Sequence, residues 1–112
     1  MIKTEAKIQQ EIFTYHWNNY PEQRGWLFMV YNNPRNEING ARMKSQGMVK
    51  GVADLCLLVP GEPPIFFEVK NSKGKQSKSQ KEWANTVSDN NLGDYFVIRD
   101  LEEAKKIAGW KR

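Results

Sequence analysis

The sequence VADLCLLVPGEPPIFFEVK, residues 52–70, decides the fold. It contains two apolar runs, residues 52–59 and 65–70, whose branched and aromatic side chains are typical of β-strands. The residues between them, 60–64, combine proline and glycine and indicate a turn. Because this turn is short, we expect the two strands to pair as an antiparallel hairpin.

The segments before residue 52 predict a helix, a strand and a connection. Apolar side chains recur every three to four residues from Lys3 to about Asn18, which indicates an amphipathic helix, and Thr4 is placed to cap its start. Residues 26–31 form a continuous apolar run, and we expect a strand covered on both faces. Residues 32–50 are polar, basic and rich in turn signals, and they favour a mobile connection or an irregular hairpin.

The segments after residue 70 predict a helix, a strand and a last helix. The first of these helices is expected to open at Ser77 and to bury an apolar face. That face comprises Trp83, Ala84 and Val87. A strand is expected at residues 95–98 and a helix from about Leu101 to Ile107. The order helix, three strands, helix, strand, helix predicts an α/β fold in which helices flank a small mixed sheet.

Length and composition predict one domain spanning residues 1–112, since domains usually hold about 100 to 200 residues. No apolar run approaches the ~18 residues of a membrane span, and the first residues lack a secretory signal. We therefore expect no membrane association and a cytoplasmic location, in a bacterial or phage-infected cell. The single cysteine, Cys56, and the single histidine, His16, exclude an internal disulfide and structural zinc. They are expected to be a buried thiol and an ordinary surface or packing residue.

The charge distribution indicates a polyanionic partner. The chain carries a net charge of +4, and residues 69–81, VKNSKGKQSKSQK, hold five lysines and no acid. Such a basic stretch is typical of nucleic-acid binding. The competing interpretation is a solvated loop and helix start.

Two acids lie in the apolar hairpin, where a buried charge costs several kcal/mol unless it is paired or metal-bound. Period-two geometry places Glu68 and Lys70 on one face of their strand, and the hairpin is expected to set Asp54 beside Glu68. Neighbouring carboxylates favour a divalent cation with oxygen ligands, and magnesium fits best. The alternative is a solvent-facing strand edge with a weak Glu68–Lys70 pair and Asp54 capping a turn.

Three short motifs together resemble the VRR-NUC family, the virus-type replication-repair nucleases of the PD-(D/E)XK superfamily. The motifs are Gly51-Val52-Ala53-Asp54-Leu55, Phe67-Glu68-Val69-Lys70 and Gly74-Lys75-x-Ser77-x-x-Gln80, and Glu5-x-x-Ile8-Gln9 resembles the first-helix motif of that family. The likeness extends from Glu5 to about Ile98. It departs at Ala53, where the family usually has proline. The resemblance implies a restriction-endonuclease-like core.

The resemblance also implies a set of site residues. Asp54, Glu68 and the backbone carbonyl of Val69 would ligate Mg²⁺ or Mn²⁺. Lys70 would orient or deprotonate the attacking water and stabilise the transition state. Glu5 would complete the site, through metal-bound water or a second ion.

Two further assignments remain open between a structural and a functional role. Glu11 is a rival to Glu5, and the role of Glu5 could be limited to an acid favoured by the helix macrodipole. Ser77-x-x-Gln80 is a capping box, in which Gln80 would only return a hydrogen bond to the Ser77 amide. However, Gln80 shares the inward face of its helix with Trp83, which favours a position beside the carboxylates.

The predicted function is a metal-dependent DNA nuclease. Its phosphate contacts are expected to bind without reading sequence. They comprise Lys73, Lys75 and Lys78, joined in a groove by Arg42, Lys44 and Lys50. The likeness of stand-alone family members to Holliday junction resolvases implies a homodimer that prefers branched DNA. The alternatives are a catalytically silent nucleic-acid-binding module, a monomeric flap- or nick-directed nuclease, and a transposase or restriction-like subunit of a larger assembly.

Overall fold

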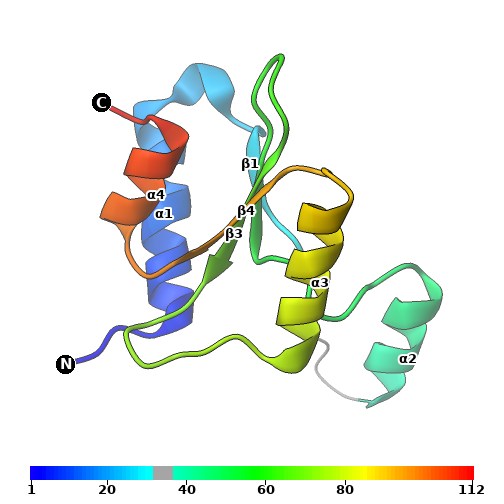
Figure 1. Cartoon of the computed structure of the whole chain (residues 1–112). Helices are drawn as coiled ribbons and strands as arrows, with labels where there is room; N and C mark the ends of the chain where they lie inside the picture. The colour runs from blue at the N-terminus through cyan, green and yellow to red at the C-terminus, as the bar shows by residue number, and fades with distance from the viewer. Residues whose placement is uncertain (32–36) are drawn as a thin grey trace.

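The computed structural model describes residues 1–31 and 37–112, which form helices on both faces of a four-stranded sheet (Figure 1). In chain order the elements are α1 (Glu5–Asn19), a short 3₁₀ turn η1 (Pro21–Gln23), β1 (Leu27–Met29), α2 (Glu37–Ser45), β2 (Leu55–Leu57), β3 (Ile65–Val69), α3 (Lys78–Asp89), β4 (Asp94–Ile98) and α4 (Leu101–Ala108). Within the described residues, no helix has the length and apolar character that crossing a membrane requires.

The sheet is mixed, with the strand order β1-β2-β3-β4. β1 pairs antiparallel with β2, and β2 pairs antiparallel with β3, as the predicted hairpin requires. β4 lies parallel to β3. A parallel neighbour needs a crossover connection, and α3 supplies it.

The two faces of the sheet have different partners because side chains alternate along β3. Phe67 and Val69 point into the main core, where they pack with Ile8 and Ile12 of α1 and with residues of α4. Phe66 points to the opposite face, where its ring meets Trp83 of α3 edge-on at 5.1 Å. Glu68 and Lys70 share the face of Phe66 by the same alternation. The site therefore lies on the α3 side of the sheet.

The predicted caps and the assignment of the two singular residues are confirmed. The Thr4 hydroxyl accepts a hydrogen bond from the Lys7 amide at the start of α1, and Ser77 caps α3. His16 is a packing residue, 1% exposed, that stacks on Tyr20. Cys56 is a free, buried thiol in β2.

Two expectations for the segment before β2 are wrong. Residues 37–45 of the expected loose connection form α2, while residues 32–36 lie outside the described residues. The Asn39-Gly40 pair is a turn signal, but the strong helix formers Ala41–Lys44 that follow it favour the helix. The helix stops before Gly47, whose φ of 110° is left-handed.

The other wrong expectation is a strand covered on both faces at residues 26–31. β1 has only three residues, and Phe28 and Met29 are 40% and 59% exposed. β1 is an outer strand of the sheet, whereas α3 packs over β3 and β4 through Trp83, so its outward side chains lack a cover. An apolar run alone does not distinguish a central strand from an outer one.

Candidate active site

The strand register places Asp54 beside Glu68. Leu55 of β2 pairs with Phe67 of β3, so Asp54, one residue before Leu55, falls opposite Glu68. The Val69 amide donates a hydrogen bond to Asp54 Oδ2 at 2.7 Å, which fixes this carboxylate at the end of β3. The structure thus brings together the two acids that the hairpin pattern predicted to meet.

Gly51 fixes the approach of this segment to α3. Its φ of 90° is left-handed, and a Cβ at this position would lie 2.3 Å from the Ser79 carbonyl oxygen. Only glycine adopts this conformation freely and leaves room for the contact. The first glycine of the motif therefore lets the chain that leads to Asp54 pass against the first turn of α3.

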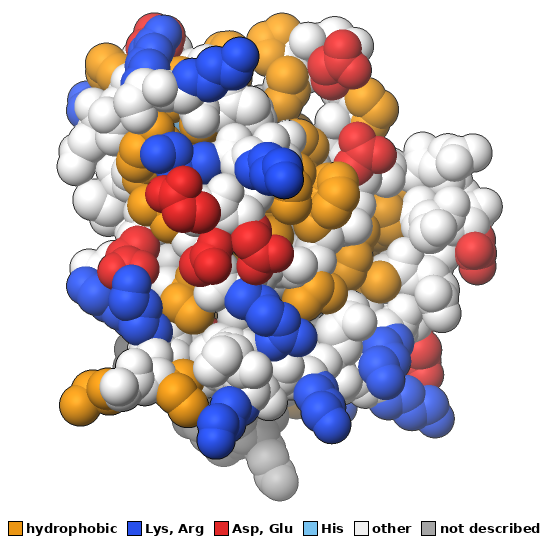
Figure 2. Space-filling model, turned by 60° about the vertical axis from the view of Figure 1, so that its left-hand side comes forward, with side chains coloured by type: hydrophobic (Ala, Val, Ile, Leu, Met, Phe, Trp, Pro, Cys, Tyr) orange, Lys and Arg blue, Asp and Glu red, His pale blue; other side chains and the backbone are white. Residues whose placement is uncertain are grey.

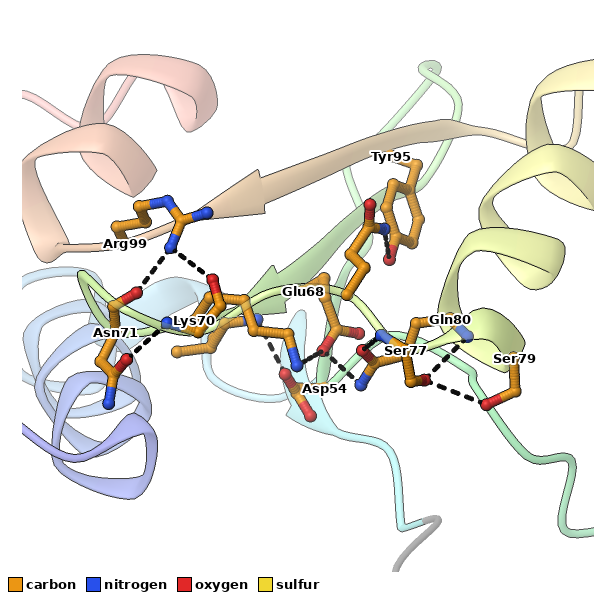
Figure 3. A network of polar contacts seen from close by, with 12 residues as sticks. Asp54, Glu68, Lys70, Asn71, Ser77, Ser79, Gln80, Tyr95 and Arg99 are labelled. Atoms are coloured by element: carbon orange, nitrogen blue, oxygen red, sulfur yellow. Dashed lines mark hydrogen bonds and ion pairs between the residues drawn. The ribbon is translucent and has the colours of Figure 1, made fainter.

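Glu68 is the most deeply buried acid of the site, with 1% of its surface exposed. Its Oε2 accepts a hydrogen bond from Gln80 Nε2 at 3.0 Å and lies 3.7 Å from Lys70 Nζ (Figure 3). Its Oε1 is buried and has no hydrogen-bond partner. An unpartnered buried carboxylate oxygen is costly, so this atom identifies a position where a ligand would be accepted.

Negative charge is disfavoured at both carboxylates. Burial, reinforced by the charge of Asp54, raises the pKa of Glu68 to about 8, against the opposing effect of Lys70. Burial also raises the pKa of Asp54, although the Val69 amide opposes this shift. Two acids whose ionised forms are both disfavoured are stabilised by a nearby cation.

Lys70 is the cation that the protein itself supplies. It is 7% exposed, and its amide donates to the Ile98 carbonyl of β4 at 2.9 Å. Because the C=O and N–H of one trans peptide unit point in opposite directions, the Val69 carbonyl points away from β4, to the side of Asp54. The predicted backbone ligand therefore faces the carboxylates.

Gln80 serves both of the roles that the sequence left open. Its Oε1 accepts a hydrogen bond from the Ser77 amide at 2.8 Å, which completes the capping box of α3. Its Nε2 donates to Glu68 Oε2. One amide side chain thus joins the start of α3 to the buried acid.

The structure places Glu5, and not Glu11, near this cluster. Glu5 is half-buried, and its Oε2 lies where a Cβ on Gly74 would come within 2.6 Å, beside the stem of Lys70. Glu11 instead forms an ion pair with Lys3 at 2.9 Å. The charge of Glu5 is a minor contribution to the raised pKa of Asp54, after burial.

The donor set fits a magnesium-like ion better than a metal that needs many side-chain ligands. Among the residues that the structure describes, no group of three His, Cys, Asp or Glu side chains could hold a metal. Magnesium, however, commonly takes one or two carboxylates and keeps several waters. Asp54, the free Oε1 of Glu68 and the Val69 carbonyl provide such a set of oxygen atoms, with Glu5 at a greater remove.

The predicted phosphate contacts lie toward one end of the molecule. Residues 71–76, the start of α3 and α2 occupy the lower end in Figure 1, and separated Lys and Arg side chains line the lower edge in Figure 2. Among the described residues, none of the six predicted basic contacts takes part in an ion pair. Five of them are exposed in loops or at helix ends: Arg42, Lys44, Lys50, Lys73 and Lys75. Lys78 is exposed in the first turn of α3.

Three residues of this region were missed from the sequence: Tyr95, Gln76 and Arg99. The Tyr95 hydroxyl accepts a hydrogen bond from Gln76 Nε2, and burial, together with the nearby acids, raises the pKa of Tyr95 to about 12. Tyr95 pairs with Phe66 in the parallel register of β3 and β4. The sequence indicates the strand but not its register, so no local signal assigns these residues to the site.

Comparison with known proteins places the fold. No model of a known family matches the chain, and no curated protein sequence matches it. A solved structure described as "VRR_NUC domain protein" superposes with a TM-score of 0.75, covering 96% of this chain and 86% of that chain at 13% sequence identity. At this identity the similarity concerns the fold alone. The predicted small mixed sheet flanked by helices is thus confirmed as a fold like that of the VRR_NUC domain protein.

Proposed function

We propose that this chain is a nuclease that hydrolyses phosphodiester bonds in DNA and depends on Mg²⁺ or Mn²⁺. The observation that carries the proposal is the buried Glu68, with one oxygen unpartnered, beside Asp54 and Lys70. The motifs that resemble the VRR-NUC family contain these three residues, and the fold agrees with that resemblance.

Asp54, Glu68 and the carbonyl of Val69 would hold the metal. When bound, the ion supplies a Lewis acid that lowers the pKa of a coordinated water and offsets charge on the phosphate. The protein contributes a fixed donor set: the Val69 amide orients Asp54, and Gln80 orients Glu68. Glu5 would support this set from the side of Gly74.

Lys70 would act on the water and on the developing charge. Its Nζ lies 3.7 Å from Glu68 Oε2, and its stem is held under Gly74, so the ammonium is confined to the site. A confined cation orients a water through hydrogen bonds and stabilises the negative charge that grows on the phosphate oxygens in the transition state. Gln80 would keep Glu68 in place while this charge develops.

The competing function is a basic nucleic-acid-binding module without catalysis. Such a module would not need an acid pair whose ionised forms are disfavoured, because these acids would repel phosphate. The burial of Glu68 with an open oxygen therefore favours the enzyme. Basic side chains at one end of the chain are compatible with both functions.

We propose further that the nuclease prefers branched DNA, four-way junctions above all, and acts as a homodimer. This part rests on the resemblance to stand-alone members of the family and on the small size of the domain, which leaves selectivity to the angle between two sites. Light scattering beside cleavage of a junction, a flap and a duplex of matched sequence tests it. A monomer that prefers flaps would replace this part and leave the chemistry unchanged.

The decisive experiment for the chemistry is DNA cleavage with Mg²⁺, with Mn²⁺ and with excess chelator. Cleavage is expected only with the metals, and Asp54→Asn and Glu68→Gln are expected to abolish it while DNA binding persists. Glu102→Gln is the control, because Glu102 is an exposed acid of α4. Cleavage in chelator, or full activity of Glu68→Gln, would contradict the proposal.

A further inference from the structure

The lysine-rich loop between β3 and α3, residues 71–76, is anchored at both ends by side chains that belong to β4 or follow it. Arg99 Nη1 donates to the carbonyl oxygens of Asn71 at 2.6 Å and Gly74 at 2.9 Å. Gln76, at the other end of the loop, donates to the Tyr95 hydroxyl at 3.1 Å. Figure 3 shows Arg99 reaching the loop from the end of β4.

The loop is also fixed from within. Asn71 Oδ1 accepts hydrogen bonds from the amides of Lys73 at 3.0 Å and Gly74 at 2.8 Å. Gly74 packs so closely on Glu5 and Lys70 that a Cβ would lie 2.6 Å from the Glu5 carboxylate. Side-chain, backbone and packing contacts therefore specify a single loop conformation.

The ordered loop presents two cations to solvent. Lys73 and Lys75 are exposed, and among the described residues neither is in an ion pair. Holding the backbone beneath a flexible lysine removes part of the entropy that binding would otherwise cost. A loop built in this way is suited to meet a rigid, repeating array of negative charges such as a nucleic-acid backbone.

Arg99 differs from these lysines in where its hydrogen bonds go. One guanidinium nitrogen donates twice to the loop backbone, and no described carboxylate lies within ion-pair distance of the group. Its own backbone amide donates to Glu103 Oε1 at 2.8 Å, which ties Arg99 to the first turn of α4. Arg99 thus connects the loop to a rigid part of the fold.

We propose that Arg99 is a positioning residue for nucleic-acid binding, which holds the 71–76 loop so that Lys73 and Lys75 meet backbone phosphates. This inference rests on the proposed DNA substrate. It deepens that proposal by assigning binding strength to a residue that acts through the loop and makes no contact with the reacting atoms.

The first test measures the loop without DNA. In hydrogen exchange of the wild-type chain, the amides of Lys73 and Gly74 are expected to be protected, and Arg99→Ala should speed their exchange about tenfold or more. Arg112→Ala is the matched control, because Arg112 also donates to a backbone carbonyl, that of Asn19, at 3.0 Å. Unchanged protection in Arg99→Ala would overturn the proposal.

The second test is a double-mutant cycle on the affinity for DNA. Arg99→Ala is expected to raise Kd about tenfold and to flatten the salt dependence by about two phosphate contacts, at ~0.9 in slope for each. In a chain that already carries Lys73→Ala and Lys75→Ala, the same change should alter Kd less than about twofold, because the lysines through which Arg99 acts are gone. Additive losses would mean that Arg99 contacts DNA directly, and would overturn the proposal.

Two further readouts separate this inference from a structural or catalytic role. The single-turnover cleavage rate at saturating DNA should change less than about twofold in Arg99→Ala, and a collapse of that rate at unchanged Kd would overturn the proposal. If Arg99→Ala does not fold, Asn71→Ala loosens the same loop from within and should weaken binding in the same lysine-dependent way; full affinity in that variant would overturn it.

The outcomes also distinguish this inference from the proposed function. A wild-type chain that binds DNA through Lys73 and Lys75 but never cleaves it would refute the nuclease and support the role of Arg99. A chain that binds no DNA would refute both.

Discussion

Glu68→Gln is expected to stabilise the protein when no divalent metal is present. The folded-state pKa of Glu68 is raised to about 8 by burial and by Asp54, whereas an unfolded glutamate has a model value of 4.5. A carboxyl whose pKa is raised on folding costs stability above its unfolded pKa, and the cost grows until the pH passes the folded pKa. The shift of Asp54 has the same direction. The free energy of unfolding of the wild type should therefore fall between pH 4.5 and 8 relative to the variant.

The size of the effect follows from the shift and from what glutamine loses. About 3.5 pH units at 1.36 kcal/mol each give an upper bound of about 5 kcal/mol at pH 8. Glutamine gives up the ion pair with Lys70 at 3.7 Å and weakens the charge-assisted bond from Gln80. A net gain of about 1 to 3 kcal/mol remains, or about 4 to 12 °C in Tm for a domain of this size.

The assay is thermal unfolding in chelator at pH 5 and pH 8, followed by circular dichroism. Glu68→Gln should melt higher than the wild type at pH 8, with the difference nearly gone at pH 5. Millimolar magnesium should raise the Tm of the wild type and narrow the gap, since a ligand stabilises the state that binds it. Glu102→Gln, an 80% exposed acid, should leave Tm unchanged. A wild type that melts higher than Glu68→Gln at pH 8 in chelator would refute the account of a disfavoured buried charge.

Three further predictions concern other parts of the site. Lys70→Met should lower the cleavage rate about a hundredfold or more with DNA affinity within a few-fold, measured by single turnover; the reverse pattern would move Lys70 to the phosphate contacts. Replacing Lys73, Lys75 and Lys78 with alanine should weaken binding to all DNA sequences alike and reduce the salt slope by about three contacts, measured by titration at several salt concentrations; an altered cleavage-site preference at constant slope would contradict this. Gly51→Ala should lower the free energy of unfolding by about 2 to 4 kcal/mol in urea, and by more than Gly47→Ala, which has the same φ sign but open space around it; equal losses would show that the contact with Ser79 is unimportant.

The hairpin and its acids could be predicted because their geometry is local. A short turn between two apolar runs sets an antiparallel pairing, and that pairing puts Asp54 opposite Glu68. The dual role of Gln80 was also accessible, since a capping box and an inward helical face are both read from spacing. These inferences needed no knowledge of distant parts of the chain.

What the sequence left undetermined depends on contacts between distant segments. The pairing of β4 with β3 brings Tyr95 and Arg99 to the lysine loop, and nothing in residues 94–99 indicates that register. The choice between Glu5 and Glu11 likewise depended on where the loop at Gly74 crosses α1. The helix α2 was missed for a different reason, because a turn-forming dipeptide near its start competed with good helix formers after it.

The hydrogen bonds of Gln80 restrict which amino acids this position can accept. A capping box works with either glutamate or glutamine at its third position, so helix formation alone does not distinguish them. The Ser77 amide can only donate, which obliges the oxygen of residue 80 to face it and leaves the opposite side of the group turned toward Glu68. A glutamate there would preserve the helix start yet set a third acid against one that already resists ionisation. Substitution by the chemically nearest residue is therefore the least tolerable one for Glu68, although it would pass unnoticed in the helix.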